Sequence, residues 1–183
     1  IAGMGGDLIC KILKAKPEFL IEGKEFILQP QSEWFKIRRL LKEYRYQIEK
    51  EWFLKEDGKY YVIIKAEPAW TQPQRLKHQQ PSIHEYIKEI SDTQVNQAVS
   101  EKDMESIYEQ YGKYLIETKN PVLKEYLEKE IVKKESIAAD LKLSIKEMES
   151  EELSGKERGN IAKRQRRYQE IQKEIRDMRK AIG

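Results

Sequence analysis

The glycine and apolar positions at the start of the chain predict a strand that turns directly into a helix. The lead Ile1-Ala2 runs into the turn Gly3-Met4-Gly5-Gly6, and apolar residues then recur at helical spacing from residue 8 to 13. This spacing predicts a helix over residues 7–15, which Pro17 ends. Glycines at such a junction let backbone N–H groups approach a ligand, and the helix start adds the positive end of its dipole. A tight turn without a ligand gives the same pattern, so both interpretations stay open.

The next stretch predicts a second strand and helix, followed by a hairpin. Residues 25–28 form a short apolar run that suits a buried strand, with Gln29-Pro30 at its carboxyl end. Ser32 is the expected N-cap of the following helix, whose apolar face runs from Trp34 to Tyr44. Residues 46–54 and 59–66 predict two strands, and Asp57-Gly58 between them is a strong hairpin signal.

This order of elements predicts an α/β fold. It corresponds to the rear half of a doubly wound, Rossmann-like sheet with an antiparallel strand pair at its end. Four strands and two helices cannot cover both faces of such a sheet, and the chain opens on Ile1 in mid-strand. We therefore expect the chain to be the rear part of a larger protein.

The last third of the chain has a different period. After Asn120-Pro121, apolar residues recur at steps of three and four as far as Met148, and again from Ile161 to the end. A break is expected from Ser154 through Gly159. The pattern predicts two amphipathic helices in an antiparallel coiled-coil hairpin. The expected division is a Rossmann-like part over 1–70, a linker and helical connector over 71–117, and a coiled-coil domain over 118–183.

Composition limits the class of protein. Charged residues make up 37% of the 183 residues, and no apolar run approaches the ~20 residues of a membrane span. We expect a cytoplasmic protein, because no secretory leader is visible and the one cysteine, Cys10, suits a reduced core thiol. His78 and His84 have no further ligands at metal-binding spacing, so no metal site is expected.

Several short motifs carry a resemblance when they are taken together. They are, in chain order, Ile1 to Ile9, Phe26-Ile27-Leu28-Gln29-Pro30, Gly58-Lys59-Tyr60-Tyr61, Tyr111-Gly112-Lys113-Tyr114-Leu115, Asn120-Pro121-Val122 and Tyr126-Leu127. Their order and spacing resemble the TrmK-like family of bacterial tRNA (adenine-N1)-methyltransferases, which methylate N1 of adenine 22 with S-adenosylmethionine. The resemblance covers roughly residues 1–67 and 108–140. The chain departs from the family at Gln31, Val62 and Lys113, where Asn, Glu and Pro are usual.

The resemblance implies the rear half of a class I S-adenosylmethionine methyltransferase sheet and a set of site residues. Gly3, Met4, Gly5 and Gly6 would bind the cofactor S-adenosylmethionine and line the pocket for the base. Met4 and Gln29 are the expected catalytic residues, with Met4 as a soft contact surface and Gln29 offering its amide to the base edge or to the backbone. No general base is evident, and adenine N1 is itself nucleophilic. Without the main donor-binding half, the fragment alone is expected to be inactive.

The tyrosine pair in the last predicted strand and the second long helix each allow two interpretations. Tyr60 and Tyr61 suit either a stacking surface or ordinary strand positions. The second long helix is rich in Lys and Arg, which suits either a solvated face or an arm that grips tRNA phosphates through Arg164, Arg166 and Arg167.

The expected partner is tRNA, with no membrane and no metal, and the expected state is a monomer or weak dimer. The alternative function is a non-enzymatic RNA- or protein-binding coiled-coil module with a vestigial α/β part.

Overall fold

The computed structural model describes residues 1–22, 25–69, 99–149 and 155–183. The chain divides into two compact units, Ile1–Asn120 and Pro121–Gly183. The interpretations of His78 and His84 concern residues that lie outside the described ranges. The proposed boundaries at 70/71 and 117/118 stay predictions.

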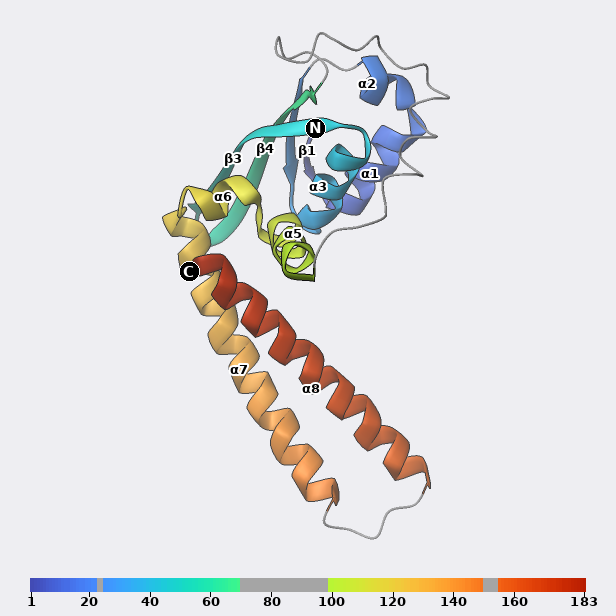
Figure 1. Ribbon diagram of the computed structural model, residues 1–183, viewed down its shortest axis with the longest axis vertical. Coiled ribbons are helices and arrows are strands. Elements are labelled where there is room, and N and C mark those ends of the chain that lie inside the picture. The colour runs from blue at the N-terminus through green and yellow to red at the C-terminus, as the bar shows by residue number, and fades with distance from the viewer. Residues whose placement is uncertain (23–24, 70–98, 150–154) are drawn as a thin grey trace. The chain divides into compact units, whose positions relative to one another are not determined.

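A four-stranded sheet forms the centre of the first unit, with strand order β1-β2-β4-β3 (Figure 1). The β1–β2 pair is parallel, whereas β2–β4 and β3–β4 are antiparallel. The strands are β1 (Ala2–Met4), β2 (Phe26–Pro30), β3 (Tyr46–Glu56) and β4 (Lys59–Pro68). The helices of this unit are α1 (Gly6–Ala15), α2 (Pro17–Glu22), α3 (Trp34–Glu43), α5 (Val99–Tyr111) and α6 (Lys113–Glu117). The predicted α/β fold is confirmed.

The helix boundaries differ from the predictions in two places. Pro17 not only follows the end of α1 but begins the short helix α2, because its fixed φ suits the first helical position. The prediction that Ser32 is the N-cap of α3 is wrong. Glu33 occupies that position, in a left-handed conformation with φ of 54°, and its side chain makes no capping hydrogen bond to the backbone of α3.

The hairpin prediction is confirmed. Glu56 pairs with Lys59, so Asp57 and Gly58 form a two-residue turn. Both have positive φ, 46° and 75°, as the hairpin turn that matches the twist of the strands requires. Beyond the turn, Val62 and alternate residues after it point into the core, which gives β4 its period of two.

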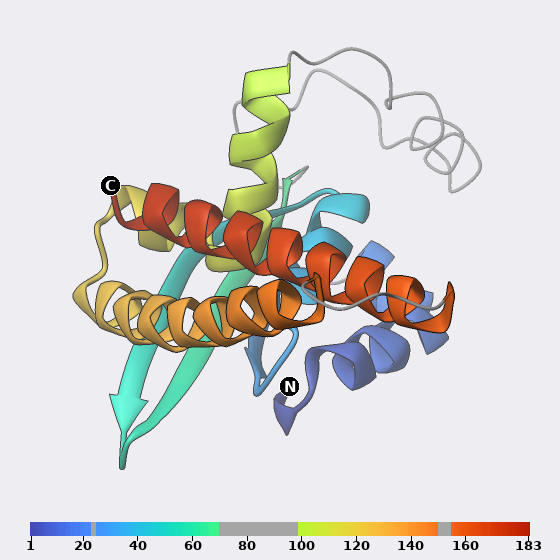
Figure 2. The ribbon, with the colours of Figure 1, turned by 90° about the horizontal axis from the view of Figure 1, so that it is seen from below.

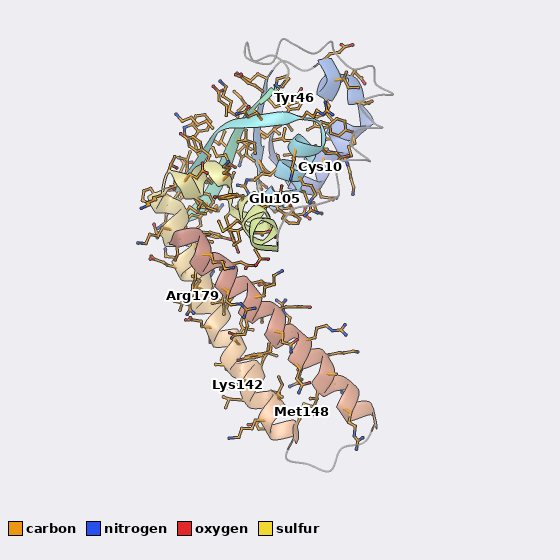
Figure 3. The ribbon with its side chains drawn as sticks, viewed as in Figure 1. Cys10, Tyr46, Glu105, Lys142, Met148 and Arg179 are labelled. Atoms are coloured by element: carbon orange, nitrogen blue, oxygen red, sulfur yellow. The ribbon has the colours of Figure 1, made fainter. Side chains whose placement is uncertain are left out.

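The core of this unit lies between the sheet and the helices that pack on it. Ile9 and Leu13 of α1 and Ile37 and Leu41 of α3 are fully or almost fully buried. Cys10, labelled in Figure 3, is a free thiol of intermediate exposure at the margin of this core. Burial raises the pKa of its thiol, so the side chain is neutral at physiological pH.

A buried ion pair connects α3, β3 and the end of α5. Arg38 Nε donates to Glu51 Oε1 at 2.8 Å, and the two side chains are only 4% and 1% exposed. Arg38 Nη1 also donates to the carbonyl oxygens of Glu109 at 3.0 Å and Gln110 at 2.9 Å, in the last turn of α5. Gly112 follows with φ of 93°, and a Cβ there would overlap the Glu51 carboxylate and lie 2.9 Å from Arg38 Nη2.

The second unit consists of two long helices, α7 (Pro121–Glu149) and α8 (Gly155–Ile182), which lie side by side (Figures 1 and 2). Glu135 at the middle of α7 pairs with Arg179 near the end of α8 at 2.5 Å, whereas Ser144, later in α7, contacts Arg164, earlier in α8. The helices are therefore antiparallel. The predicted apolar stripe faces inward, and its buried members are Leu127, Ile131, Ala138, Ile161, Ile171, Ile175 and Met178. Supercoiling of the pair stays a prediction.

The predicted break between these helices is wrong at its far end. Helix α8 begins at Gly155 and runs through Gly159, whose place in the helix interior costs only about 1 kcal/mol relative to alanine. None of the helices in the described ranges combines the length and apolarity needed to cross a lipid bilayer.

We expect Gly112→Ala to lower the free energy of unfolding of the first unit by about 2–4 kcal/mol, because alanine is strained at this φ and has no room beside the ion pair. Urea unfolding measures the change. Gly159→Ala is the matched control: a Cβ there meets nothing within 4 Å, so the substitution should stabilise α8. Equal effects of the two substitutions would contradict the assigned role of Gly112.

Candidate functional site

Two loops contact each other at the carboxyl ends of the parallel strands β1 and β2. The Gln31 N–H donates to the Met4 carbonyl at 2.8 Å, and the Gly6 N–H donates to the Ser32 carbonyl at 2.9 Å. A Cβ on Gly6 would lie 2.6 Å from the carbonyl oxygen of Glu33, so only glycine permits this approach. The glycine loop (Gly3 to Gly6) is therefore joined through its backbone to the turn that follows β2.

The predicted site residues Gly3 and Gln29 are in direct contact. The register of the β1–β2 pair shifts between Ala2, opposite Gln29, and Met4, opposite Pro30, so Gly3 is the extra residue of a bulge. Gly3 has φ of 77°, and its N–H donates to Gln29 Oε1 at 2.8 Å. A Cβ on Gly3 would meet nothing within 4 Å, so the backbone here borders open space. Gln29 thus offers its amide oxygen to the backbone, and contact with a base edge stays a prediction.

The N-terminus of α1 is capped from outside the helix. Glu33 Oε2 accepts a hydrogen bond from the Asp7 N–H at 3.1 Å, and the Gly6 N–H is already taken by Ser32. The positive end of this helix, which the sequence suggested as a feature open to a ligand, is therefore occupied by protein groups.

Lysines surround this cap. Lys36 Nζ lies 2.5 Å from Glu33 Oε1 and 2.9 Å from Asp7 Oδ1, and Lys11 Nζ lies 2.8 Å from Asp7 Oδ2. The hydrogen bonds from Lys11 and Lys36 lower the pKa of Asp7 to about 2. The hydrogen bond from Lys36, with that from the Asp7 backbone, lowers the pKa of Glu33. Both carboxylates are ionised at neutral pH. Sequence analysis missed Glu33, because only its left-handed backbone directs its side chain toward α1.

An aromatic cluster lies beside this turn. Trp34, the first residue of α3, meets Phe53 edge-on at 5.4 Å between ring centroids, and Phe53 lies 5.8 Å from Tyr60. Lys55 Nζ is 5.8 Å from the centroid of the Tyr60 ring. Tyr60 and Tyr61 are both half-buried. Tyr60 therefore serves strand packing, and a stacking role for either tyrosine stays a prediction.

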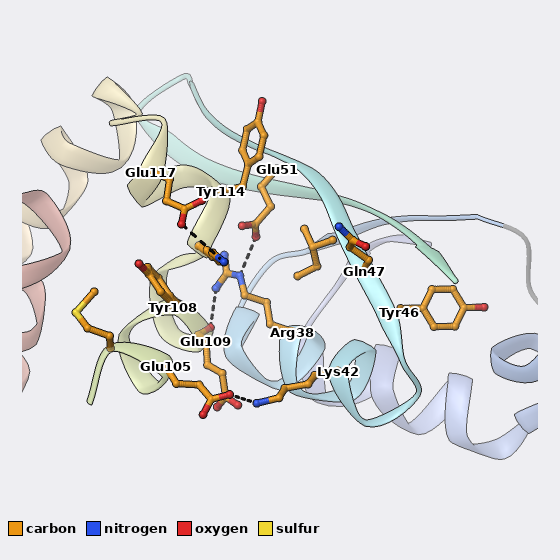
Figure 4. A pocket seen from close by; sticks show the side chains of 13 residues that line it. Arg38, Lys42, Tyr46, Gln47, Glu51, Glu105, Tyr108, Glu109, Tyr114 and Glu117 are labelled. Carbon is orange, nitrogen blue, oxygen red and sulfur yellow. Dashed lines mark hydrogen bonds and ion pairs between the residues drawn. The ribbon is translucent and has the colours of Figure 1, made fainter. Parts of the chain in front are cut away.

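A groove of about 770 Å³ lies elsewhere in the first unit, between α3, β3, α5 and α6 (Figure 4). None of the predicted site residues lines it. Six of its charged side chains are paired with one another: Arg38 with Glu51, Lys42 with Glu105, and Lys113 with Glu117. The carboxylate of Glu109 pairs with Arg39, which does not line the groove. The pairing makes this groove part of the structural framework.

The three arginines predicted to contact RNA lie on α8, in the second unit. Arg164 donates to Ser144 Oγ, and Arg167 Nη1 lies 3.1 Å from Glu170 and 3.6 Å from Glu174. Arg166 is exposed, and its charge has no ion-pair partner among the described residues. In the described part of the chain, no group of three or more His, Cys, Asp and Glu residues could hold a metal ion.

Comparisons with known proteins agree on one family. The family model described as tRNA (adenine(22)-N(1))-methyltransferase matches residues 1–165. The curated protein of that name from Bacillus subtilis is 34% identical, over 52% of this chain and 52% of that protein. The chain spans about half the length of the curated relatives it matches.

Solved structures support the same fold. The crystal structure of the B. subtilis M1A22 tRNA methyltransferase TrmK aligns with a TM-score of 0.59 at 23% identity, over all of this chain and 62% of that one. The structure of M. capricolum TrmK with S-adenosyl-homocysteine aligns at 0.57 and 19% identity, over all of this chain and 57% of that one.

We expect Lys36→Met to raise the pKa of Asp7, because the substitution removes one of the two lysines that stabilise its carboxylate. A carboxyl-carbon NMR titration measures the midpoint. The Asp7 pKa in the folded protein lies below its ordinary value of 3.8, so its contribution to stability is present above about pH 4 and is lost as the pH falls toward 2. In the variant this loss should begin at higher pH. Lys42→Met, on the same helix but paired with Glu105, is the control and should leave the Asp7 midpoint unchanged.

Proposed function

The chain belongs to the tRNA (adenine(22)-N(1))-methyltransferase family, and we propose that its protein transfers a methyl group from S-adenosylmethionine to N1 of an adenine in tRNA. The observation that carries the proposal is the match over residues 1–165, which include the glycine loop, the turn after β2 and all of α7. The reaction takes place in the cytoplasm, where newly made tRNA is modified.

The glycine loop suits the approach of a donor and a base. S-adenosylmethionine supplies, when bound, a methyl group carried on a positively charged sulfonium. Gly3 borders open space, so a ligand can approach its backbone, and the half-buried Met4 follows it directly. Gly5 and Gly6 support the same loop by packing against Ser32 and Glu33.

The residues at the site act chiefly by positioning. Adenine N1 carries a lone pair that attacks the methyl carbon directly, so the step needs alignment more than proton transfer. Gln29 holds the bulge at Gly3, and the turn after β2 holds Gly6. Met4, between these two fixed points, supplies a polarisable contact surface for the base.

The exposed basic residues of α8 suit the phosphates of a folded RNA. Arg166 and Lys173 stand one heptad apart, about 10 Å along the helix, on the side away from the buried stripe. Lys163 and Arg176 extend this exposed basic surface. Phosphate contacts of this kind supply affinity and register without reading sequence.

The methylation assay tests the proposed reaction. The full-length protein is incubated with labelled S-adenosylmethionine and unmodified tRNA transcripts, and the digested RNA is analysed by mass for N1-methyladenosine. Met4→Ala should lower kcat by about 10- to 100-fold, since a small misplacement of the reacting groups is costly. Met148→Ala, the same substitution on α7, should leave kcat unchanged. Absence of N1-methyladenosine with folded protein and a range of tRNAs would favour the binding-module alternative.

Substitution of neighbouring arginines tests the RNA surface. Arg166→Ala should weaken tRNA binding by about three- to tenfold and reduce the salt dependence by about one counterion. Arg167→Ala is the matched control and should have a smaller effect, because Glu170 and Glu174 already offset its charge. Binding isotherms at several salt concentrations measure both. An equal loss in the two variants would contradict this assignment of the contact surface.

A further inference from the structure

Glu33 has an uncommon backbone conformation at the edge of the candidate site. Its φ of 54° and ψ of 40° lie in the left-handed region, which residues other than glycine, asparagine and aspartate seldom adopt. This conformation places the Glu33 carboxylate on the Asp7 N–H and the Glu33 carbonyl beside Gly6. Such strained residues persist where the surrounding structure holds them, often at functional sites.

We propose that Glu33 is a positioning residue whose carboxylate closes the N-terminus of α1, excludes anions from the glycine loop and makes the loop favourable to positive charge. The second half of this inference rests on the proposed methyl transfer, because it concerns the cationic donor. Nothing in the family match assigns a role to Glu33.

The first part of the argument concerns the helix end. An uncapped helix N-terminus attracts anions through its free N–H groups and its dipole, and it disfavours cations. At α1 the Gly6 N–H is bound by the Ser32 carbonyl and the Asp7 N–H by the Glu33 carboxylate. Phosphate therefore finds no free donors at these two positions.

The second part concerns the charges around the cap. The groups that face Glu33 and its neighbours are Asp7, Lys11 and Lys36, with two lysines balanced by two carboxylates. Without the Glu33 carboxylate, two lysines would face one carboxylate at the positive end of a helix. A cation bound at the glycine loop would then be repelled.

The proposed reaction keeps one positive charge at the site throughout. The lone pair of adenine N1 forms a bond to the methyl carbon, the bond from that carbon to sulfur breaks, and its electron pair stays on sulfur. The charge thus moves from the sulfonium to the adenine ring, and no proton leaves in this step. A carboxylate beside the loop favours both charged states.

NMR of the protein tests the cap without any enzymatic readout. The amide signal of Asp7 should stay unmoved when inorganic phosphate is added to the unmodified protein, and should shift saturably in Glu33→Ala, which frees this N–H. Glu33→Gln keeps an acceptor oxygen, so its Asp7 amide should remain protected from hydrogen exchange. Glu43→Ala, on the same helix, is the control. A saturable phosphate shift in the unmodified protein, or an Asp7 amide that exchanges freely, would overturn the cap.

Ligand affinities of the full-length protein test the charge effect. S-adenosylmethionine is cationic at sulfur, whereas S-adenosyl-homocysteine has a neutral thioether. The two compounds therefore differ in charge at this sulfur atom. Glu33→Gln should weaken binding of the former by about three- to tenfold and leave binding of the latter unchanged. If Glu33→Gln weakened the binding of both compounds equally, or left both affinities unchanged, the charge effect would be overturned even where N1-methyladenosine is formed. If neither compound binds, the proposed function and the charge effect both fail, while the phosphate titration still decides the cap.

Discussion

The ion pair between Arg38 and Glu51 is the interaction on which the first unit depends. Both side chains are almost fully removed from water, so each charge relies on the other and on the hydrogen bonds around it. Burial raises the pKa of the Glu51 carboxyl, and the Arg38 guanidinium opposes this shift. Removal of one partner from such a pair lowers the free energy of unfolding by about 3–5 kcal/mol, because the remaining charge is buried without a counter-charge. The guanidinium also donates hydrogen bonds to carbonyl oxygens in the last turn of α5. The Arg38 side chain therefore connects α3 to β3 and to the end of α5.

Helix α3 links this framework to the candidate site. Its middle carries Arg38, whereas its first turn carries Lys36 and follows Glu33, which caps α1. The helix is only ten residues long, and the burial of Ile37 and Leu41 holds it against the sheet. The position of the glycine loop therefore depends on the same rigid element that carries the buried ion pair. Substitutions at the ion pair can change the loop without touching it.

Local sequence signals accounted for most of the elements but not for their long-range contacts. Asp57-Gly58 predicted the hairpin because the turn needs positive φ at both positions, and the glycine loop predicted the β1–α1 junction. Ser32 was the obvious cap by residue type, yet its carbonyl bonds to Gly6 and Glu33 takes the cap position. Gly159 looked like a break, yet α8 already begins at Gly155, because a single glycine costs a helix only about 1 kcal/mol relative to alanine.

In the candidate site, too, local signals predicted some residues, and residues that depend on long-range contacts were missed. Gly3, Met4 and Gln29 were predicted and lie together, because the carboxyl ends of adjacent parallel strands meet. Glu33, Lys36 and the Arg38–Glu51 pair were not predicted. Each depends on contacts between segments far apart in sequence, and a charged residue in a predicted helix gives no sign of a buried partner.

The position of Cys10 gives the chain a built-in chemical probe. It is the only cysteine in the sequence, and it lies in α1 one turn beyond the capped end. Because burial keeps the thiol protonated, alkylating reagents will modify it slowly while α1 stays packed. Comparison of its rate of alkylation in the folded and the urea-unfolded chain therefore reports how far the packing of α1 protects this position, without an engineered label.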